Sequence, residues 1–299
     1  MRAVQFDQYG GPVVLHLSDV AEPHAGPGQV RIRVRAAGVN GIDWKTRAGY
    51  MQRMRPIPLP AGTGVDASGV VDQIGEGVTD VAVGDPVFGS GSATWAEYAV
   101  LTAWAIKPQE LSFEEAAGYP LPVETALRIL DEVGVQPGQT LLVSGAAGGV
   151  GSAVVQFARQ RNITVLATAS AGNQGHLRAL GAEPLVYGEG LVERVQALAA
   201  NGVDAALDIA GHGVVPALIE LTGDPSRVLS IGDFRAGELG AKVSVKPVDP
   251  AGASAQAARL FEHGAFHLPV ARTFPLDQAA AAQEASEAGH VAGRFIVSV

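Results

Sequence analysis

Residues 140–170 constrain the fold more than any other stretch, because they join a strand, a glycine-rich turn, a helix and a second strand in that order. An apolar run, TLLVSG, leads into AAGGVG (146–151), and helical spacing follows. Gly148 would let the main chain approach a pyrophosphate, Gly151 would let the helix pack closely on the strand, and free amides at the helix start would bind the anion. Ala146 stands where the usual GxGxxG pattern has its first glycine. The order of elements favours a dinucleotide site built on Ala147, Gly148, Gly149 and Val150, although a purely structural turn remains an alternative.

Strands and helices alternate along the chain after residue 140. Apolar runs predict strands at 140–144, 163–169, 204–209 and 227–232, and helical spacing predicts helices at 149–161, 173–180, 190–200 and 213–221. This order predicts a doubly wound parallel sheet of the Rossmann type within an α/β protein. Ile209, Ile231 and Gly232 fall at strand ends, where the cofactor of such a sheet binds.

Residues 1–115 have a different character. In QVRIRVRAAGV (29–39), Val30, Ile32 and Val34 alternate with arginines, which is the period of a half-buried strand. Further short strand candidates alternate with turns rich in Gly, Pro and Asp, and this spacing predicts a small barrel or sandwich. At about 100–200 residues per domain, a chain of 299 residues suggests two domains.

The end of the predicted strand 163–169 bears on the choice of coenzyme. A site for NAD normally places Asp or Glu there, to bind the 2′-hydroxyl of the ribose. This chain has Ala169 and Ser170, and no acid follows until Glu183. Ser170 can donate a hydrogen bond to a 2′-phosphate, and His176 and Arg178 are the nearest basic residues, although Arg178 could simply be a solvated helix residue. The sequence therefore favours NADPH.

Composition excludes several classes of function. The formal net charge is −9 and no basic run occurs, so nucleic acid is not an expected partner. The chain has no cysteine, which excludes a disulfide, a thiol nucleophile and a zinc site built on thiolates. Seven histidines are scattered, and His263 and His267 are spaced by four but followed by Pro269, which argues against a ligand helix. No uninterrupted apolar window of about 18 residues and no signal peptide is visible, so we expect a soluble cytoplasmic protein with no membrane partner.

Six sequence blocks in order carry a resemblance to a known family. The chain resembles the zinc-independent quinone oxidoreductase branch of the medium-chain dehydrogenase/reductase superfamily over nearly its full length, in these blocks: AAGVNGIDWKTRAGY (36–50), GTGVDASGVVDQIGEGVTDVAVGDPVFG (62–89), LSFEEAAGYPLPVETAL (111–127), GAAGGVG (145–151), GVDAALDIAG (202–211) and PLDQAAAAQEASEAGHVAGRFIV (275–297). The resemblance implies a GroES-like catalytic domain from residues 1–115 and 265–299, a Rossmann domain from residues 116–264, and an active site in the cleft. It also implies hydride transfer from NADPH to a small quinone or activated alkene, commonly by a homodimer.

The same resemblance assigns candidate site residues by their motifs. Asn40 matches an asparagine that borders the nicotinamide, although it could be a turn residue, and Asp43 matches an acid that could instead cap the following helix. Lys45 stands where many relatives have tyrosine, and Tyr50 falls one position early, so Lys45, Tyr50 or water remain alternatives for the proton donor. The further cofactor residues implied by the motifs are Thr125, Tyr187 and Arg294, each of which could instead be structural. Where many NADPH-using relatives have lysine after the second strand, this chain has Asn173.

Zinc-dependent relatives have a cysteine where this chain has Asn40, and a His-Glu pair where it has Val65-Asp66. Valine and asparagine do not suit zinc, so no metal is expected. Without a Lewis acid, the easier hydride acceptors are those whose own conjugation takes up the charge.

The sequence therefore predicts an NADPH-dependent enzyme that reduces quinones. Two alternatives remain, an enoyl or enal reductase of the same fold, and an NADPH-binding sensor with little catalysis.

Overall fold

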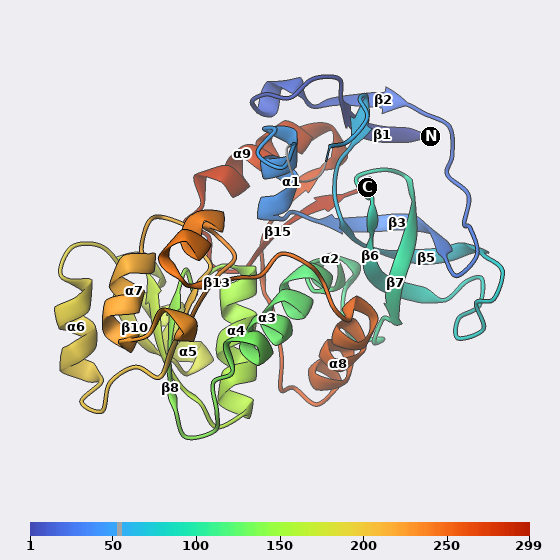
Figure 1. Ribbon diagram of the computed structural model, residues 1–299. Coiled ribbons are helices and arrows are strands. Elements are labelled where there is room, and N and C mark those ends of the chain that lie inside the picture. The colour runs from blue at the N-terminus through green and yellow to red at the C-terminus, as the bar shows by residue number, and fades with distance from the viewer. Residues whose placement is uncertain (53–55) are drawn as a thin grey trace. The chain divides into compact units, whose positions relative to one another are not determined.

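The structure is a computed structural model that describes residues 1–52 and 56–299 (Figure 1). The chain forms two compact units. The first contains residues 1–121, 249–289 and 293–299, and the second contains residues 122–248 and 290–292. Both ends of the chain therefore belong to the first unit.

The first unit contains a six-stranded sheet in which four strands close into a ring. The strand order is β14-β15-β3-β5-β6-β7, and β3 also pairs with β7. The strands are β3 (Val30–Gly38), β5 (Asp66–Ile74), β6 (Pro86–Ser92), β7 (Tyr98–Ile106), β14 (Val270–Pro275) and β15 (Arg294–Ser298). A smaller sheet joins β2 (His16–Asp19), β1 (Arg2–Phe6) and β4 (Ala61–Gly62). The ring β3-β5-β6-β7 is a small barrel. The sequence predicted either a barrel or a sandwich for residues 1–115.

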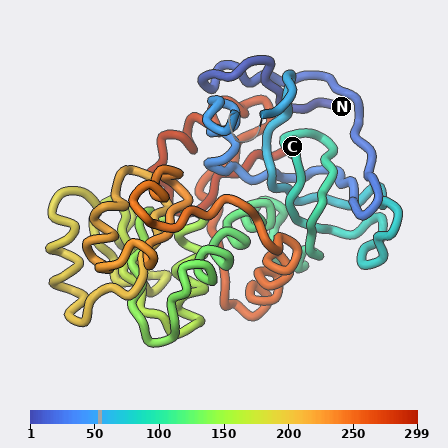
Figure 2. Tube along the Cα trace, in the orientation of Figure 1, coloured from blue at the N-terminus to red at the C-terminus, as the bar shows by residue number. Residues whose placement is uncertain are grey.

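The predicted alternation in residues 29–39 is confirmed. Val30, Ile32 and Val34 are at most 2% exposed and pack with Val71 and Leu101 in the barrel core. The C-terminal segment returns to this sheet, since β15 pairs antiparallel with β3, and Figure 2 shows the red end of the trace lying against the blue N-terminal part.

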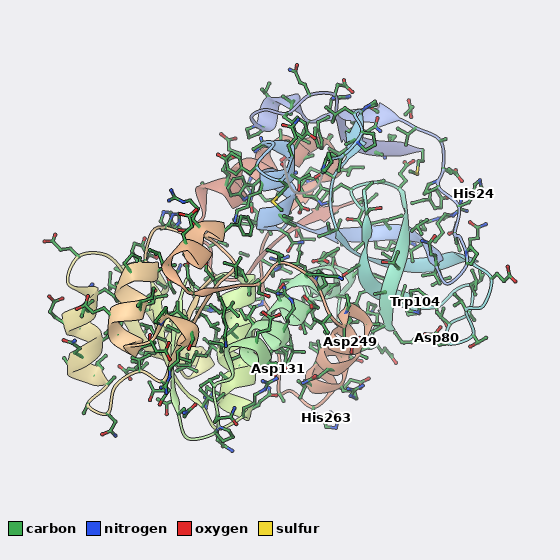
Figure 3. The ribbon with its side chains drawn as sticks, viewed as in Figure 1. His24, Asp80, Trp104, Asp131, Asp249 and His263 are labelled. Atoms are coloured by element: carbon green, nitrogen blue, oxygen red, sulfur yellow. The ribbon has the colours of Figure 1, made fainter. Side chains whose placement is uncertain are left out.

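The described residues of the first unit also form the helices α1 (Gly41–Arg47), α2 (Phe113–Ala117), α8 (Pro250–Glu262) and α9 (Ala279–Ala288). Helix α8 packs on β7 and β6. Figure 3 labels Asp249 and His263 at its two ends and Trp104 on β7. The sequence boundaries assign residues 249–264 to the Rossmann domain, whereas the structure groups them with the first unit because of this packing.

An ion pair between a buried arginine and an exposed glutamate joins α1 to α9. Arg47 is fully buried, and its Nη2 donates to Glu287 Oε2 over 2.9 Å. Burying a guanidinium is costly unless it is paired, so this contact fixes the orientation of α1. Helix α1 begins directly after Asn40 and carries Asp43, so the pair also fixes two of the predicted site residues.

The second unit contains a parallel six-stranded sheet with the order β10-β9-β8-β11-β12-β13. Its strands are β8 (Thr140–Ser144), β9 (Thr164–Ala169), β10 (Glu183–Val186), β11 (Ala205–Asp208), β12 (Val228–Ser230) and β13 (Lys242–Val243). Its helices are α3 (Pro120–Val133), which starts in the first unit, α4 (Gly149–Gln160), α5 (Gln174–Leu180), α6 (Leu191–Leu198) and α7 (Val215–Thr222). The reversal of strand order at β8 confirms the predicted doubly wound sheet.

The four predicted strands after residue 140 correspond to β8, β9, β11 and β12, and the four predicted helices to α4–α7. The sequence analysis missed the short edge strands β10 and β13. Among the described residues, no helix is long and apolar enough to cross a membrane.

Candidate active site

The first group of candidate residues lies at the start of α1. Asn40 ends the extended segment after β3 and caps the helix, and its backbone N–H donates to Asp43 Oδ2 over 2.8 Å. Asn40 and Asp43 are 2% and 3% exposed. Asp43 therefore caps the helix, which the sequence analysis gave as the alternative to a site role. Its carboxyl group is also buried.

The amide of Asn40 is held from both sides by charged groups. Its Nδ2 donates to Asp66 Oδ2 over 2.9 Å, and its Oδ1 accepts from Arg294 Nη2 over 2.7 Å. Asp66 lies at the start of β5 and Arg294 at the start of β15, so three segments distant in the sequence meet here. We call Asn40, Asp43, Asp66 and Arg294 the polar cluster.

Asp66 is a member of this cluster that the sequence analysis noted only as a replaced zinc position. It is fully buried and accepts hydrogen bonds from the Leu121 N–H over 3.1–3.2 Å and from Ser90 Oγ over 3.4 Å. One feature of the sequence could have identified Asp66, because it is a carboxylate at the start of an apolar strand. A charge buried there requires partners, so its position predicts a polar site.

Burial shifts the pKa of every ionisable member of the cluster. Burial raises the pKa of Asp43 to about 8, an effect that the hydrogen bond from Asn40 only partly offsets and that the charge of Asp66 increases. Burial also raises the pKa of Asp66, to about 6, against the opposing effects of Arg294 and the Asn40 amide. Burial lowers the pKa of Arg294, although both carboxylates oppose this. At neutral pH, Arg294 and Asp66 are thus charged and balance each other, while most Asp43 holds a proton.

The remaining catalytic candidates lie elsewhere on α1 and after it. Lys45 places its ammonium 5.7 Å from the centre of the Trp44 ring, and Tyr50 packs edge-on against the same ring at 5.8 Å. Tyr50 is 66% exposed. The structure therefore groups Lys45 and Tyr50 around Trp44, and their assignment as proton donors remains a prediction.

The glycine-rich turn joins β8 to α4 as predicted. Gly148 is the N-cap of α4, and a Cβ placed on it would meet no atom within 4 Å, so the space in front of the helix start is open. A Cβ on Gly151 would lie 2.4 Å from Ala146 Cα and from the Gly145 carbonyl oxygen. The first amides of an α-helix have no partner within the helix, so the start of α4 fits the pyrophosphate of a dinucleotide.

A buried hydroxyl fixes this turn from behind. Ser152 Oγ lies 3.1 Å from the Ala147 carbonyl oxygen and 3.0 Å from His176 Nε2. Burial lowers the pKa of His176, so this residue is neutral at pH 7 and supports the turn rather than offering a charge to a phosphate.

The carboxyl ends of β9 and β10 bring together several predicted cofactor residues. Gln174 Nε2 donates to the carbonyl oxygens of Ala169, Ser170 and Leu185, which ties the two strand ends together. Ser170 opens the 3-10 turn η2 (Ala171–Asn173), and Tyr187 follows β10 and is 46% exposed. His290, which the sequence analysis did not select, lies at this edge as well, with Nδ1 3.5 Å from Tyr187 Oη.

Arg178 lies at the opposite edge of the sheet, contrary to its assignment as a cofactor residue. It is in the last turn of α5 and lines a pocket with Thr164 and Glu183, the first residues of β9 and β10. A cofactor of a doubly wound sheet binds at the carboxyl ends of the strands, whereas α5 carries Arg178 back to the amino ends. The prediction for Arg178 is therefore wrong.

The other predicted positions are buried or lie at strand ends. Ile209 and Ile231 directly follow β11 and β12, and Gly232 comes next. Thr125 is on α3 and 6% exposed. Asp208, at the end of β11, was not predicted; it accepts from Ser230 Oγ over 2.8 Å and from the Gly211 N–H over 2.9 Å. These bonds stabilise the edge at which the predicted residues lie.

Within residues 1–52 and 56–299, no group of three or more His, Asp or Glu side chains is placed to hold a metal ion. The sequence itself contains no cysteine.

Comparisons with known proteins agree with this arrangement. Residues 26–109 match the alcohol dehydrogenase GroES-like domain, and residues 180–297 match the zinc-binding dehydrogenase family. A quinone oxidoreductase of Lama guanicoe is 32% identical over 242 residues, which is 78% of this chain and 73% of that protein. The chain belongs to the quinone oxidoreductase branch of the medium-chain dehydrogenase/reductase superfamily.

Other relatives carry different names. A 2-methylene-furan-3-one reductase of Solanum lycopersicum is 39% identical over 198 residues, 61% of this chain and 51% of that protein. The matched region thus spans about half the length of several curated relatives. Among solved structures, the quinone oxidoreductase of Coxiella burnetii superposes with a TM-score of 0.87 at 31% identity, covering 100% of this chain and 99% of that one. Escherichia coli quinone oxidoreductase complexed with NADPH superposes with a TM-score of 0.87 at 25% identity, covering 100% of both chains.

The two glycines of the turn generate a paired prediction. Gly151→Ala should lower the melting temperature by several degrees, because its Cβ has no room, although alanine normally stabilises a helix interior by about 1 kcal/mol. Gly148→Ala should leave the melting temperature nearly unchanged, because that position is open. Thermal unfolding followed by circular dichroism would check both; equal losses for the two variants would contradict the placement of the turn.

The raised pKa of Asp43 predicts how stability depends on pH. Since the native state holds a proton that the unfolded state releases near pH 4, the wild-type protein loses stability between about pH 4 and the native pKa of about 8. Asp43→Asn keeps an oxygen for the Asn40 N–H but cannot ionise. Its melting temperature, measured relative to wild type, should rise by a few degrees between pH 5 and pH 8 and then level off. A difference that does not change with pH would show that Asp43 is ionised throughout.

Proposed function

We propose that this protein is an NADPH-dependent oxidoreductase that transfers hydride to quinones without zinc. The observation that carries the proposal is the polar cluster. At the positions where zinc-dependent relatives supply cysteine and glutamate ligands, Asn40 and Asp66 hydrogen-bond to each other, and the Arg294 cation is bound to Asn40. A guanidinium already supplies the positive charge here, and the asparagine amide is a poor zinc ligand.

The second unit fits NADPH as coenzyme. The open start of α4 at Gly148 suits the pyrophosphate, and Ala169 and Ser170 present no carboxylate that would repel a 2′-phosphate. The name of the Escherichia coli structure, which is complexed with NADPH, supports the same choice.

When bound, NADPH would supply a hydride from nicotinamide C4. The amides of Ala147, Gly148, Gly149 and Val150 would bind its pyrophosphate, and Thr125, Ile209, Ile231 and Gly232 would line its path along the strand ends. Asn40, whose amide cannot rotate without losing both charged partners, would border the nicotinamide. Since no residue of the polar cluster acts as a Lewis acid, the protein would contribute mainly position and electrostatics, which suits an acceptor that delocalises the incoming charge.

A second candidate function is favoured by Asp43. Because Asp43 Oδ2 accepts the Asn40 N–H, the oxygen that would carry the proton of the neutral acid is Oδ1, which is buried and has no hydrogen-bond partner in the structure. Reduction of an enone needs a proton at the α-carbon after hydride reaches the β-carbon, and a carboxylic acid with a pKa of about 8 can hold one at neutral pH. The tomato relative named as a 2-methylene-furan-3-one reductase points to the same class of acceptor.

The quinone activity can be tested by following NADPH absorbance with a simple quinone, after dialysis of the protein against a chelator. We expect quinone-dependent oxidation of NADPH that is unchanged by dialysis. Gly148→Asp should weaken NADPH binding at least tenfold, since it places a carboxylate beside the pyrophosphate in a position that the fold tolerates. The proposal fails if NADPH does not bind, if no quinone is reduced, or if the chelator abolishes activity.

Asp43→Asn separates the two acceptor classes. If Asp43 supplies the proton, kcat for an α,β-unsaturated ketone should fall by about 100-fold, whereas kcat for a quinone should change little because both quinone oxygens can take protons from water. The comparison uses one preparation and one coenzyme concentration for both acceptors. Equal losses for ketone and quinone would instead assign Asp43 a structural role.

A further inference from the structure

His290 lies in a short segment that packs with the second unit although the flanking α9 and β15 belong to the first. Its carbonyl oxygen accepts from Asn173 Nδ2 over 3.4 Å, and its Nδ1 lies 3.5 Å from Tyr187 Oη. Asn173 ends the turn that follows β9, and Tyr187 follows β10. These two contacts place the imidazole at the carboxyl ends of β9 and β10.

The backbone of His290 is in an uncommon conformation. Its φ of 61° lies in the left-handed region, which is sparsely populated by residues other than glycine but in which Asn, Asp and His are enriched. The side chain is exposed, so a ligand can reach it.

The side chains gathered around His290 can all donate hydrogen bonds. Asn173 offers an amide and Tyr187 a phenol, and His290 offers a positive charge when it is protonated. Ser170, at the start of the turn that ends at Asn173, carries a hydroxyl. The contacts of 3.4 and 3.5 Å are long for hydrogen bonds, so they can be exchanged for shorter bonds to an anion. Such a group of donors suits a phosphate monoester.

Other nearby cations are already engaged or placed elsewhere. Arg178 lies at the amino ends of the strands, and His176 is neutral and bound to Ser152. Arg194 donates to the carbonyl oxygens of Val186, Gly188 and Glu189, so its guanidinium holds the loop after β10.

We propose that protonated His290 binds the phosphate on the adenosine 2′-oxygen of NADPH, and that the preference for NADPH over NADH therefore depends on pH. The inference rests on the proposed function, because it concerns the same coenzyme site. His290 would supply the positive charge for the 2′-phosphate, which Asn173 and the residues beside it do not carry.

Other ionisable groups near His290 could also make coenzyme binding depend on pH. The loop after β10 contributes Tyr187, and the turn η2 contributes the uncharged Asn173. Glu189 lies in the same loop as Tyr187, where its backbone carbonyl oxygen accepts from Arg194. On the side of α9, the nearest acid in sequence, Glu287, is paired with Arg47. A phosphate monoester binds its second proton near pH 6, so its own titration must be separated from that of the histidine.

The test compares 2′,5′-ADP with ADP as probes, using isothermal titration calorimetry between pH 6 and pH 8.5. In the wild-type protein, 2′,5′-ADP should bind more tightly than ADP, and this ratio should fall by about tenfold on going from pH 6.5 to pH 8.5, the change expected for loss of one charge-assisted hydrogen bond. His290→Asn keeps a residue suited to the left-handed backbone and removes the charge. In this variant the ratio should be low and independent of pH between 6.5 and 8.5, while ADP affinity is unchanged.

His24→Asn is the matched control, since His24 is exposed and lies in the first unit (Figure 3). It should reproduce the wild-type ratio at each pH. An unchanged ratio in His290→Asn, with both probes still bound, would overturn the role of His290 and leave the proposed function intact. Failure of both probes to bind wild-type protein would instead overturn the proposed function and this inference with it.

Discussion

The side-chain amide of Asn40 lies between an anion and a cation, and the candidate active site in the first unit depends on this arrangement. Asp66 accepts from its nitrogen and Arg294 donates to its oxygen. Rotating the amide by half a turn would face acceptor with acceptor and donor with donor in a buried site, where an unmet hydrogen bond costs about 1–3 kcal/mol. The two charges thus orient the amide, and the amide in turn joins two charges that balance each other.

The two carboxyl groups of the polar cluster differ because their partners differ. The charge of Arg294 lowers the pKa of both, but Asp66 accepts hydrogen bonds from the Leu121 N–H, Ser90 and Asn40. Asp43 accepts one backbone N–H, and the charge of Asp66 raises its pKa further. Burial is nearly complete for both, so the partners account for native pKa values of about 6 and about 8. Between these two pH values one carboxyl is ionised and the other holds a proton. A single buried cluster can therefore orient a neighbouring group and store a proton at the same time.

Sequence reasoning succeeded where the determining interactions are local. The strand, turn and helix around Gly148 follow from apolar periodicity and from the need for close approach at Gly151, both of which a short window contains. The polar cluster was recovered only in part. Asn40 and Asp43 share one helix start, and Arg294 was named from its motif as a cofactor residue, but Asp66 was missed. Asp66 and Arg294 reach the helix start through β5 and β15, and pairing between distant strands leaves no local trace. The assignment of α8 was missed for the same reason, since a helix pattern does not say which sheet will cover it.

The wrong assignment of Arg178 and the omission of His290 have a common physical cause. In a doubly wound sheet the helix after a strand runs back to the amino edge, so only the residues of the first turn after the strand remain beside the cofactor. After β9 these are residues 170–173, none of which is basic, and a basic residue in the last turn of α5 cannot substitute for them. A cation for a phosphate at this edge must then come from another part of the chain. The segment between α9 and β15 brings His290 there, and histidine differs from the lysine of many relatives in that its charge is lost within the physiological pH range. Replacing a lysine that follows β9 by a histidine from a distant part of the chain would thus keep a positive charge at this edge, but only while the histidine is protonated.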